Sequence, residues 1–297
     1  MQKIISQRII KKKFFKHLID ILIMRELKKR AEIFNLDREI PFAVFANDWI
    51  GININVHGLF EKEYIEDLKK LLVLIDVDLS NSIAIDVGAN IGNHSIEFSK
   101  YFEKVVCFEP NPRVFDVLHA NIKQIKNIVA YNFGCGANKE TLTLNEDFNN
   151  LGSSSARYKI KSNNLVEVNI KPLDDYLNEL KRVCLIKIDV EGMEIETLKG
   201  AEKVIKKFNP LICFEQREIE FTKIHVETEA IDWLRNRGYR IYSNIRLKRR
   251  NIILRRFNNL KQFIFGVIQN RKIVEFQKLP KGNYSMIYAI HSSMIRN

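Results

Sequence analysis

The stretch that most constrains the fold runs from Ile83 to His94 and reads IAIDVGANIGNH. Its first five residues are apolar apart from Asp86, and three of them are β-branched, which is typical of a buried strand. Gly88 and Gly92 then allow a sharp turn, and the polar residues after them favour the start of a helix. A strand, a tight turn and a helix in so short a stretch predict a parallel α/β domain.

The turn suits a ligand with a small anionic group. We expect the helix to begin near Asn90, where free N–H groups attract an anion and the flanking Gly88 and Gly92 let it approach. The G-x-G-x-x-G pattern of dinucleotide sites is absent, because Asn90 replaces the second glycine and Asp86 would repel a diphosphate. Glu109 closes the next apolar run at about the offset expected of a ribose-binding carboxylate. These features favour S-adenosylmethionine, which has one carboxylate, two cationic centres and a ribose diol; the alternative is that both acids merely end strands.

Strand-like and helix-like segments alternate along the chain. The expected strands are residues 83–87, 105–108, 128–133, 184–188, 211–214, 239–242 and 285–290; the expected helices are residues 61–74, 90–101, 112–125, 173–180, 194–206 and 227–237. Residues 141–144 and 166–170 are expected to form a hairpin, and residues 42–60 to form two short strands around Asn47 and Asp48. This alternation predicts a mostly parallel sheet with helices on both faces, which binds ligands beyond the carboxyl ends of its strands. The acids at those ends are Asp86, Glu109, Asp189 and Glu215.

Several motifs, in this order, resemble the FkbM-type S-adenosylmethionine-dependent methyltransferases. They are DVGANIG at 86–92, FEP at 108–110, GSS at 152–154, PLDDYL at 172–177, KIDVEGME at 187–194 and LKGA at 198–201. The resemblance covers about residues 42–243 and the final strand. It implies the class I methyltransferase fold, with a seven-stranded sheet whose last strand is antiparallel, and methyl transfer, commonly to an oxygen of a sugar, a lipid-linked glycan or a secondary metabolite. One departure is GCGA at 134–137, which lacks the acid that the family usually has there.

Asp189 is the first candidate for a catalytic carboxylate, and Glu191 is the second. Asp189 ends a central strand, where it could accept a proton from the acceptor or bind the methionyl ammonium group. The predicted cofactor-binding residues are Asp86, Gly88, Asn90, Gly92, Glu109 and Asp189. The alternative for Glu191 is that it has no catalytic role and only stabilises the start of the following helix.

Other residues are secondary candidates for the site. His57 and His94 are alternative bases, Glu215 is expected to line the acceptor pocket, and the loop at 152–155 either covers the acceptor or only joins the hairpin. Asp189 and Glu191 together could hold a divalent cation, but no third ligand is identifiable, and we expect no metal.

Charge divides the chain into three parts. Residues 1–38 contain 11 Lys or Arg and 4 Asp or Glu, and residues 244–281 contain 11 Lys or Arg and 1 Glu. Residues 39–243, in contrast, contain 25 Lys or Arg and 31 Asp or Glu. We expect residues 1–78 to form a basic N-terminal extension and residues 79–297 the S-adenosylmethionine-dependent domain, with a basic insertion at 244–281. The basic segments would attract an anionic membrane or a phosphorylated glycan, or act only as a solvated surface. The helical spacing within 1–38 suits an interfacial helix or one packed on the main domain.

The composition predicts a globular cytoplasmic protein whose basic segments could contact a membrane surface. No apolar run is long enough to span a bilayer, and no signal-peptide cleavage site follows the N-terminus. The four cysteines lack the spacing of metal ligands, so we expect them to be reduced thiols in the core. The main hypothesis is O-methylation of a sugar, glycan or small-molecule hydroxyl. The alternative is a non-catalytic, methyltransferase-like module that docks on an anionic membrane or nucleic acid. Nucleic-acid bases are disfavoured as substrates, because DVEG at 189–192 stands where base methyltransferases often carry an Asn/Asp-Pro-Pro-aromatic motif.

Overall fold

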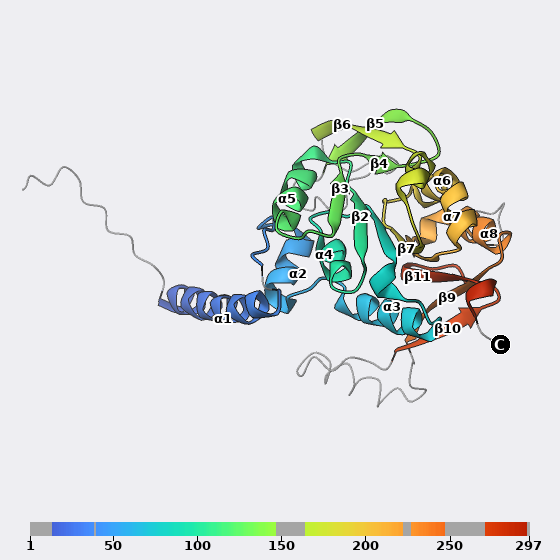
Figure 1. Cartoon of the computed structure of the whole chain (residues 1–297). Helices are drawn as coiled ribbons and strands as arrows, with labels where there is room; N and C mark the ends of the chain where they lie inside the picture. The colour runs from blue at the N-terminus through green and yellow to red at the C-terminus, as the bar shows by residue number, and fades with distance from the viewer. Residues whose placement is uncertain (1–13, 39, 147–163, 222–226, 247–270, 296–297) are drawn as a thin grey trace, which may run out of the picture.

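A mostly parallel sheet forms the centre of the molecule (Figure 1). The computed structural model describes residues 14–38, 40–146, 164–221, 227–246 and 271–295. The strands of the main sheet are β1 (Ile83–Val87), β2 (Lys104–Phe108), β3 (Ile128–Tyr131), β7 (Val183–Ile188), β8 (Leu211–Gln216), β9 (Tyr239–Arg246), β10 (Arg271–Phe276) and β11 (Tyr284–His291). Over the described residues these eight strands lie in the order β10-β9-β11-β8-β7-β1-β2-β3. The five from β8 to β3 are parallel, and β11 is antiparallel to both of its neighbours.

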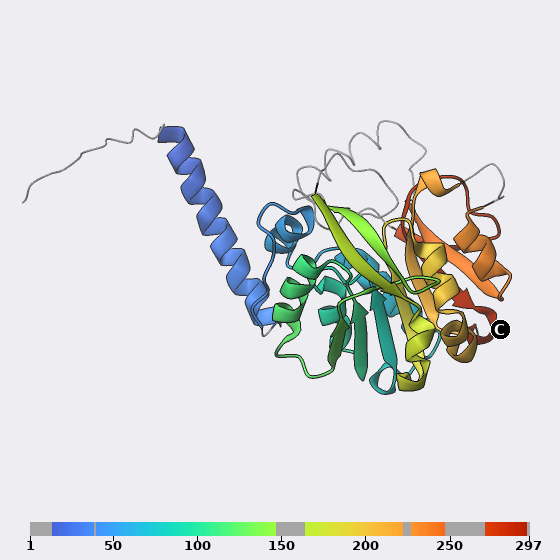
Figure 2. The same cartoon turned by 90° about the horizontal axis from the view of Figure 1, so that it is seen from above.

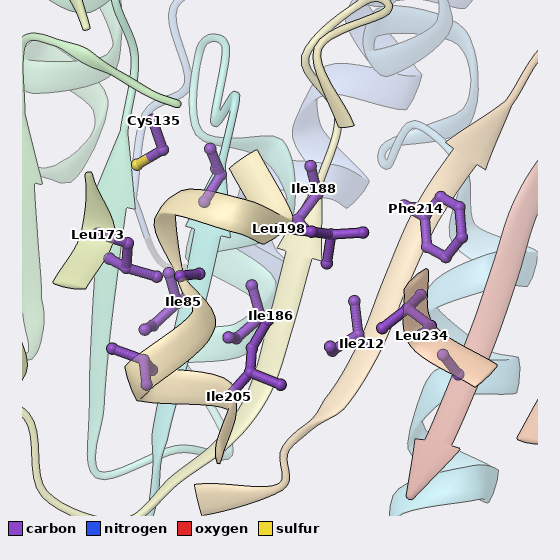
Figure 3. Close-up of a cluster of buried hydrophobic side chains, with 14 of the residues drawn as sticks. Ile85, Cys135, Leu173, Ile186, Ile188, Leu198, Ile205, Ile212, Phe214 and Leu234 are labelled. Carbon is purple, nitrogen blue, oxygen red and sulfur yellow. The ribbon is translucent and has the colours of Figure 1, made fainter. Parts of the chain in front are cut away.

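Helices cover both faces of this sheet. On one face lie α3 (Lys62–Leu74), α4 (Asn93–Ser99) and α5 (Pro112–Ile122). On the other lie α6 (Glu194–Gly200), α7 (Glu202–Phe208), α8 (Glu229–Arg235) and the 3-10 helix η3 (Leu173–Glu179). Figure 3 shows Leu198, Ile205 and Leu234 of these helices beside Ile186 and Ile212 of the strands. This is the α/β class I methyltransferase fold that the resemblance implies.

The side chains of β1 divide between the two faces. Ile83, Ile85 and Val87 belong to the core cluster beneath α6 and α7, whereas Ala84 belongs to the cluster beneath α4 and α5. Successive side chains of a strand point to opposite faces, and both faces are covered, so a nearly continuous apolar sequence is required. Asp86 is the exception: it is fully buried and therefore needs polar partners in the interior. The four cysteines are buried and unpaired, as predicted.

Two expectations at the edges of the fold differ from the structure. Residues 42–60 contain a helix, α2 (Trp49–His57), and the prediction of two strands is wrong. Asp48 starts this helix, because its carboxylate accepts hydrogen bonds from the N–H groups of Ile50 and Gly51. The main sheet also has one strand more than the seven expected, since β10, within the predicted basic insertion, pairs antiparallel with β9.

The predicted hairpin is confirmed. Strands β5 (Glu140–Glu146) and β6 (Asn164–Lys171) pair antiparallel, and β4 (Gly134–Cys135) adds to β6 in parallel. Together they form a second, three-stranded sheet at one end of the main sheet (Figure 1). The predicted loop at 152–155 lies outside the described residues, as do residues 1–13 and 247–270 of the two basic segments. The other short elements among the described residues are the 3-10 turns η1 (Leu79–Asn81), η4 (Glu218–Glu220) and η5 (Ser292–Met294).

Helix α1 (Phe14–Arg38) projects away from the body (Figure 2). Its C-terminal half meets the end of α2, where the Arg30 guanidinium donates to the Val56 carbonyl at 2.5 Å and the Phe34 ring lies against Gly58. The predicted helix therefore exists, but only its C-terminal half is packed, and it packs against α2. Among the described residues, no helix combines the length and hydropathy needed to cross a bilayer.

Candidate active site

A cavity of about 350 Å³ lies at the carboxyl ends of the parallel strands. Its wall is built by the residues after β1, β2, β7 and β8, by β4 to β6, and by the segment around α2. Sheets of this kind bind ligands at this edge. The predicted site residues that line the cavity are Gly88, Asn90, His94, Glu109, Asp189, Glu191 and Glu215. The predicted residues that do not line it are His57, Asp86 and Gly92.

The turn after β1 is shaped by two strand ends that nearly touch. Gly88 has φ = +77°, and a Cβ atom there would lie 1.9 Å from the carbonyl oxygen of Asp189. Only glycine fits this position, and the close approach brings Asp189 beside the turn. The expectation that the helix begins near Asn90 is wrong, because α4 begins at Asn93 with Gly92 as its N-cap. Asn90 lies within the turn itself, at φ = +51°.

Glu109 faces the cavity from the end of β2 and is fixed by the backbone. Its Oε2 accepts a hydrogen bond from the Asn90 N–H at 2.9 Å, and its Oε1 accepts one from the Asn111 N–H at 2.9 Å. Burial raises the pKa of Glu109 to about 7, while the two backbone hydrogen bonds act in the opposite direction. A carboxyl group held this firmly can accept hydrogen bonds from a pair of neighbouring hydroxyl groups on a ligand.

Behind the turn, Asp86 forms a buried ion pair with Lys187. The Lys187 Nζ lies 3.3 Å from Asp86 Oδ1 and 3.4 Å from Asp189 Oδ2, and Asp86 Oδ2 accepts a hydrogen bond from the Ser95 hydroxyl at 2.7 Å. Burial alone would lower the pKa of Lys187, but the carboxylates of Asp86 and Asp189 raise it, so the lysine is charged. Asp86 therefore acts in this structure by holding Lys187 and Ser95, and Lys187 links it to the cavity-lining Asp189.

Three carboxyl groups gather where β7 and β8 end. Asp189, Glu191 and Glu215 each place an oxygen within 4.8 Å of the other two, so the structure supplies the third acid that spacing alone did not identify. Arg217 forms ion pairs with Glu191 and, at 3.8 Å, with Glu215. Burial, and then the charge of Asp189, raises the pKa of Glu215 to about 7. Lys187 and Arg217 thus already compensate much of the negative charge of this cluster.

Glu61 also faces the cavity, although the sequence pattern marks it only as the start of a helix. It stands before α3 with φ = +56°, and its Oε2 lies 3.4 Å from the Nε2 of His94. Burial and then Asp189 raise the pKa of Glu61 to about 8, whereas burial and then Lys187 lower the pKa of His94 to about 3. Both side chains are therefore mainly neutral at pH 7, and Glu61 is the one that titrates near that pH.

Asn93 holds this segment over the cavity. Its Oδ1 accepts a hydrogen bond from the Phe60 N–H at 3.0 Å, and its Nδ2 donates to the Phe60 carbonyl at 2.9 Å. These bonds join residues that are 33 positions apart, so no local pattern reveals them. His57, in contrast, is exposed at the end of α2.

The part of the cavity near Glu109 is mostly apolar. Its lining residues are Pro110, Cys135, Leu142, Leu144 and Ile170. Gly134 lies among them without room for a side chain, since a Cβ atom would come 2.7 Å from Ile170 Cδ1. A flat, uncharged ring such as a purine would pack against this surface.

Comparisons with known proteins point to one family. The Methyltransferase FkbM domain matches residues 86–241, just over half of the chain. Methyltransferase 1 of Beauveria bassiana is 26% identical over 54% of this chain and 72% of its own length. Methyltransferase sdnD of Sordaria araneosa is 30% identical over 42% of this chain and 62% of its own length. The hexuronic acid methyltransferase AglP of Haloferax volcanii is 24% identical over 47% of this chain and 58% of its own length. The chain thus spans less than two thirds of the last two proteins.

Proposed function

The chain belongs to the FkbM methyltransferase domain family, and from that premise we propose that it methylates a hydroxyl group of a sugar, a glycan or a small molecule. The cofactor of this family is S-adenosylmethionine. One observation carries the proposal: a single cavity joins Glu109 and its apolar wall to a cluster of acids at the ends of β7 and β8. The first half suits a nucleoside, and the second suits a positively charged sulfur beside an acceptor hydroxyl.

The cofactor half of the cavity is assigned by chemistry. Glu109 would accept hydrogen bonds from the ribose hydroxyls, and the wall formed with Pro110 and Ile170 would pack against the adenine. The backbone from Gly88 to Asn90 would lie against the methionyl group. Asp189 would face the ammonium and sulfonium charges, and when bound the cofactor supplies an electrophilic methyl group on that sulfonium.

The acceptor must lose a proton, and Glu61 is the residue we assign to receive it. Asp189 is already engaged in an ion pair with Lys187, at 3.4 Å. Glu61 contacts the neutral His94 instead, and its pKa of about 8 is close to working pH, where a general base is most effective. Glu191, the second predicted candidate, is held in an ion pair by Arg217.

A sugar acceptor is supported by three observations. The relative AglP is named for the methylation of hexuronic acid. Arg217 lines the cavity with a side chain that is about one-third exposed, and it would give a carboxylated sugar a cation to contact. Trp49 and Phe60, which also line the cavity, offer aromatic surfaces to a sugar ring.

Cofactor binding is tested by titration calorimetry with S-adenosylmethionine on the purified chain. We expect binding, and we expect Glu109→Ala to weaken it by at least about tenfold, because the ribose hydroxyls lose a fixed acceptor. Glu103→Ala, at an exposed acid that precedes the same strand, is the matched control and should bind normally. A wild-type chain that does not bind the cofactor would exclude the proposed function.

The acceptor class is tested with cofactor labelled in its methyl group. The chain is incubated with hexoses, hexuronic acids and their nucleotide- and lipid-linked forms, and products are treated with mild alkali. A methyl ether on a hydroxyl survives this treatment, whereas a methyl ester on a carboxyl group is released. Alkali-stable label supports the proposal, and label that is wholly alkali-labile assigns the carboxyl group as acceptor instead.

A further inference from the structure

We propose that the N-terminal half of α1 lies in the surface of an anionic lipid bilayer and holds the enzyme there. This inference goes beyond the proposed function and does not depend on the acceptor. It rests on the apolar face of the helix, on the position of the helix outside the body, and on the charges at the two ends of that face.

The apolar face consists of Phe15, Leu18, Ile19, Leu22 and Ile23. At about 100° per residue, these five side chains fall within an arc of about 140°, which is the width of a helix face that needs covering. All five are exposed, Phe15 to 76% and Leu22 to 57%. Lys16, His17 and Asp20 lie outside this arc.

In the described part of the chain, nothing covers Leu18, Ile19, Leu22 or Ile23 of this face. Figures 1 and 2 show the N-terminal half of α1 extending into solvent, and contacts with the body come from Arg30 and Phe34 in the C-terminal half. A helix that exposes such a row of large apolar side chains is poorly stable in water alone and marks an interaction surface.

The charges beside the face identify its partner. Lys11, Lys12 and Lys13 precede it in the sequence, and Arg25, Lys28 and Lys29 follow it. Residues 1–30 contain ten Lys or Arg and two Asp or Glu. A short apolar face between basic clusters is typical of helices that lie in an anionic membrane interface, with lysine and arginine at the headgroups.

A second copy of the chain is a less suitable partner. Two such helices side by side would bring basic clusters together in either the parallel or the antiparallel direction, and like charges repel. The face is also wider than the seam of a two-stranded coiled coil, which uses two positions in seven. Anionic headgroups, in contrast, complement both clusters at once.

The helix is joined firmly to the wall of the cavity. The Phe34 ring leaves no room for a side chain at Gly58, since a Cβ atom there would lie 2.7 Å from its Cδ1. Gly58 ends α2, and the first turn of α2 lines the cavity with Trp49 and Ile50. A membrane-bound α1 would therefore fix the position of the cavity relative to the bilayer.

The test is flotation of the full chain with vesicles of phosphatidylcholine alone and of phosphatidylcholine with about one-quarter phosphatidylglycerol. We expect binding to the anionic vesicles that is at least about tenfold tighter than to the neutral ones and that weakens with salt. The double variant Ile19→Asp/Leu22→Asp should lose at least about tenfold in affinity. Val73→Asp, at a side chain of α3 that is 74% exposed, is the matched control and should bind like the wild type.

Calorimetry with S-adenosylmethionine shows whether each variant is folded, and we expect unchanged cofactor affinity in all of them. Equal vesicle binding by the double variant, or no binding by the wild type, would overturn the proposal. So would a wild-type dimer, seen by analytical ultracentrifugation, that the double variant converts to a monomer, since a second copy would then cover the face. Binding of RNA in preference to the anionic vesicles would also overturn it.

Discussion

Glu61 and Asp189 face the same cavity but have different surroundings. Asp189 lies beside the charged Lys187, whereas Glu61 lies 3.4 Å from a histidine that burial keeps neutral. The pKa of Glu61 is raised to about 8, first by burial and then by Asp189. A neutral acid near an acceptor hydroxyl becomes a base only after it loses its proton, so the pH dependence of methyl transfer should report this residue.

Replacement of Glu61 by glutamine should abolish that dependence. In the wild type, kcat/KM for an acceptor found by the labelled-methyl screen should rise with pH and level off above about 8. Glu61→Gln should lower it by roughly a hundredfold and remove the rise, with cofactor affinity unchanged. His57→Gln, at an exposed histidine outside the cavity, is the control. A Glu61→Gln enzyme with the wild-type pH profile would show that another group accepts the proton.

The three clustered carboxyl groups give a second prediction at this scale. Arg217 and Lys187 already form ion pairs with members of the cluster. A divalent cation would have to break these side-chain ion pairs in order to bind. We therefore expect magnesium to add no stability: the melting temperature of the chain in MgCl2 should match that in EDTA within about 1 °C. A magnesium-dependent rise of several degrees, lost on Glu215→Gln, would instead identify the cluster as a metal site.

Among the elements, the junction of β1 and β7 depends most on one residue. Gly88 combines φ = +77° with a position where a Cβ atom would lie 1.9 Å from the Asp189 carbonyl oxygen. Gly88→Ala should destabilise the fold by roughly 3 kcal/mol or more, measured by urea denaturation, because a backbone atom must move. Gly282→Ala is the control: a Cβ atom there would meet only the Tyr284 ring, at 3.6 Å, so the change should stay within about 0.5 kcal/mol. Equal effects of the two changes would contradict this account.

The elements differ in how well the sequence predicts them. Strands such as β1 and β7 are buried on both faces, so their apolar runs are unambiguous and the parallel sheet follows from them. Residues 42–60 are ambiguous, because a short apolar run fits a strand or a helix, and the N-cap role of Asp48 appears only in three dimensions. The extra strand β10 is not predicted, because it lies in the basic segment 244–281, which the sequence characterises only by its charge.

The same limit applies to the candidate site. The residues that the motifs identified, such as Glu109 and Asp189, stand at strand ends, and parallel topology brings strand ends together. Glu61 follows Phe60, which long-range hydrogen bonds to Asn93 hold over the cavity. Lys187 lies within the motif, yet sequence alone does not show that a lysine in an apolar strand has two carboxylates beside it.

For the molecule as a whole, the buried acids make stability depend on pH. The pKa of Glu61 and of Glu194 is raised to about 8, and that of Glu109 to about 7, in each case first by burial. Between pH 4.5 and 8 the folded chain therefore binds more protons than the unfolded chain, so its stability falls as pH rises. His94, with a pKa lowered to about 3, acts in the opposite sense, but only below about pH 6.5.

Above pH 6.5 only these buried carboxyl groups contribute, and the ligand-free chain should lose roughly 4 to 5 kcal/mol of unfolding free energy between pH 6.5 and 8.5. Glu194 is the residue with which to test this, because it is 3% exposed and does not line the cavity. Glu194→Gln keeps an acceptor for the Gly192 N–H but cannot ionise, so urea denaturation should show a shallower decline. Glu103→Gln, at an exposed acid, should decline as the wild type does. A flat wild-type profile over this range would mean that the buried acids ionise as readily in the folded chain as in the unfolded one.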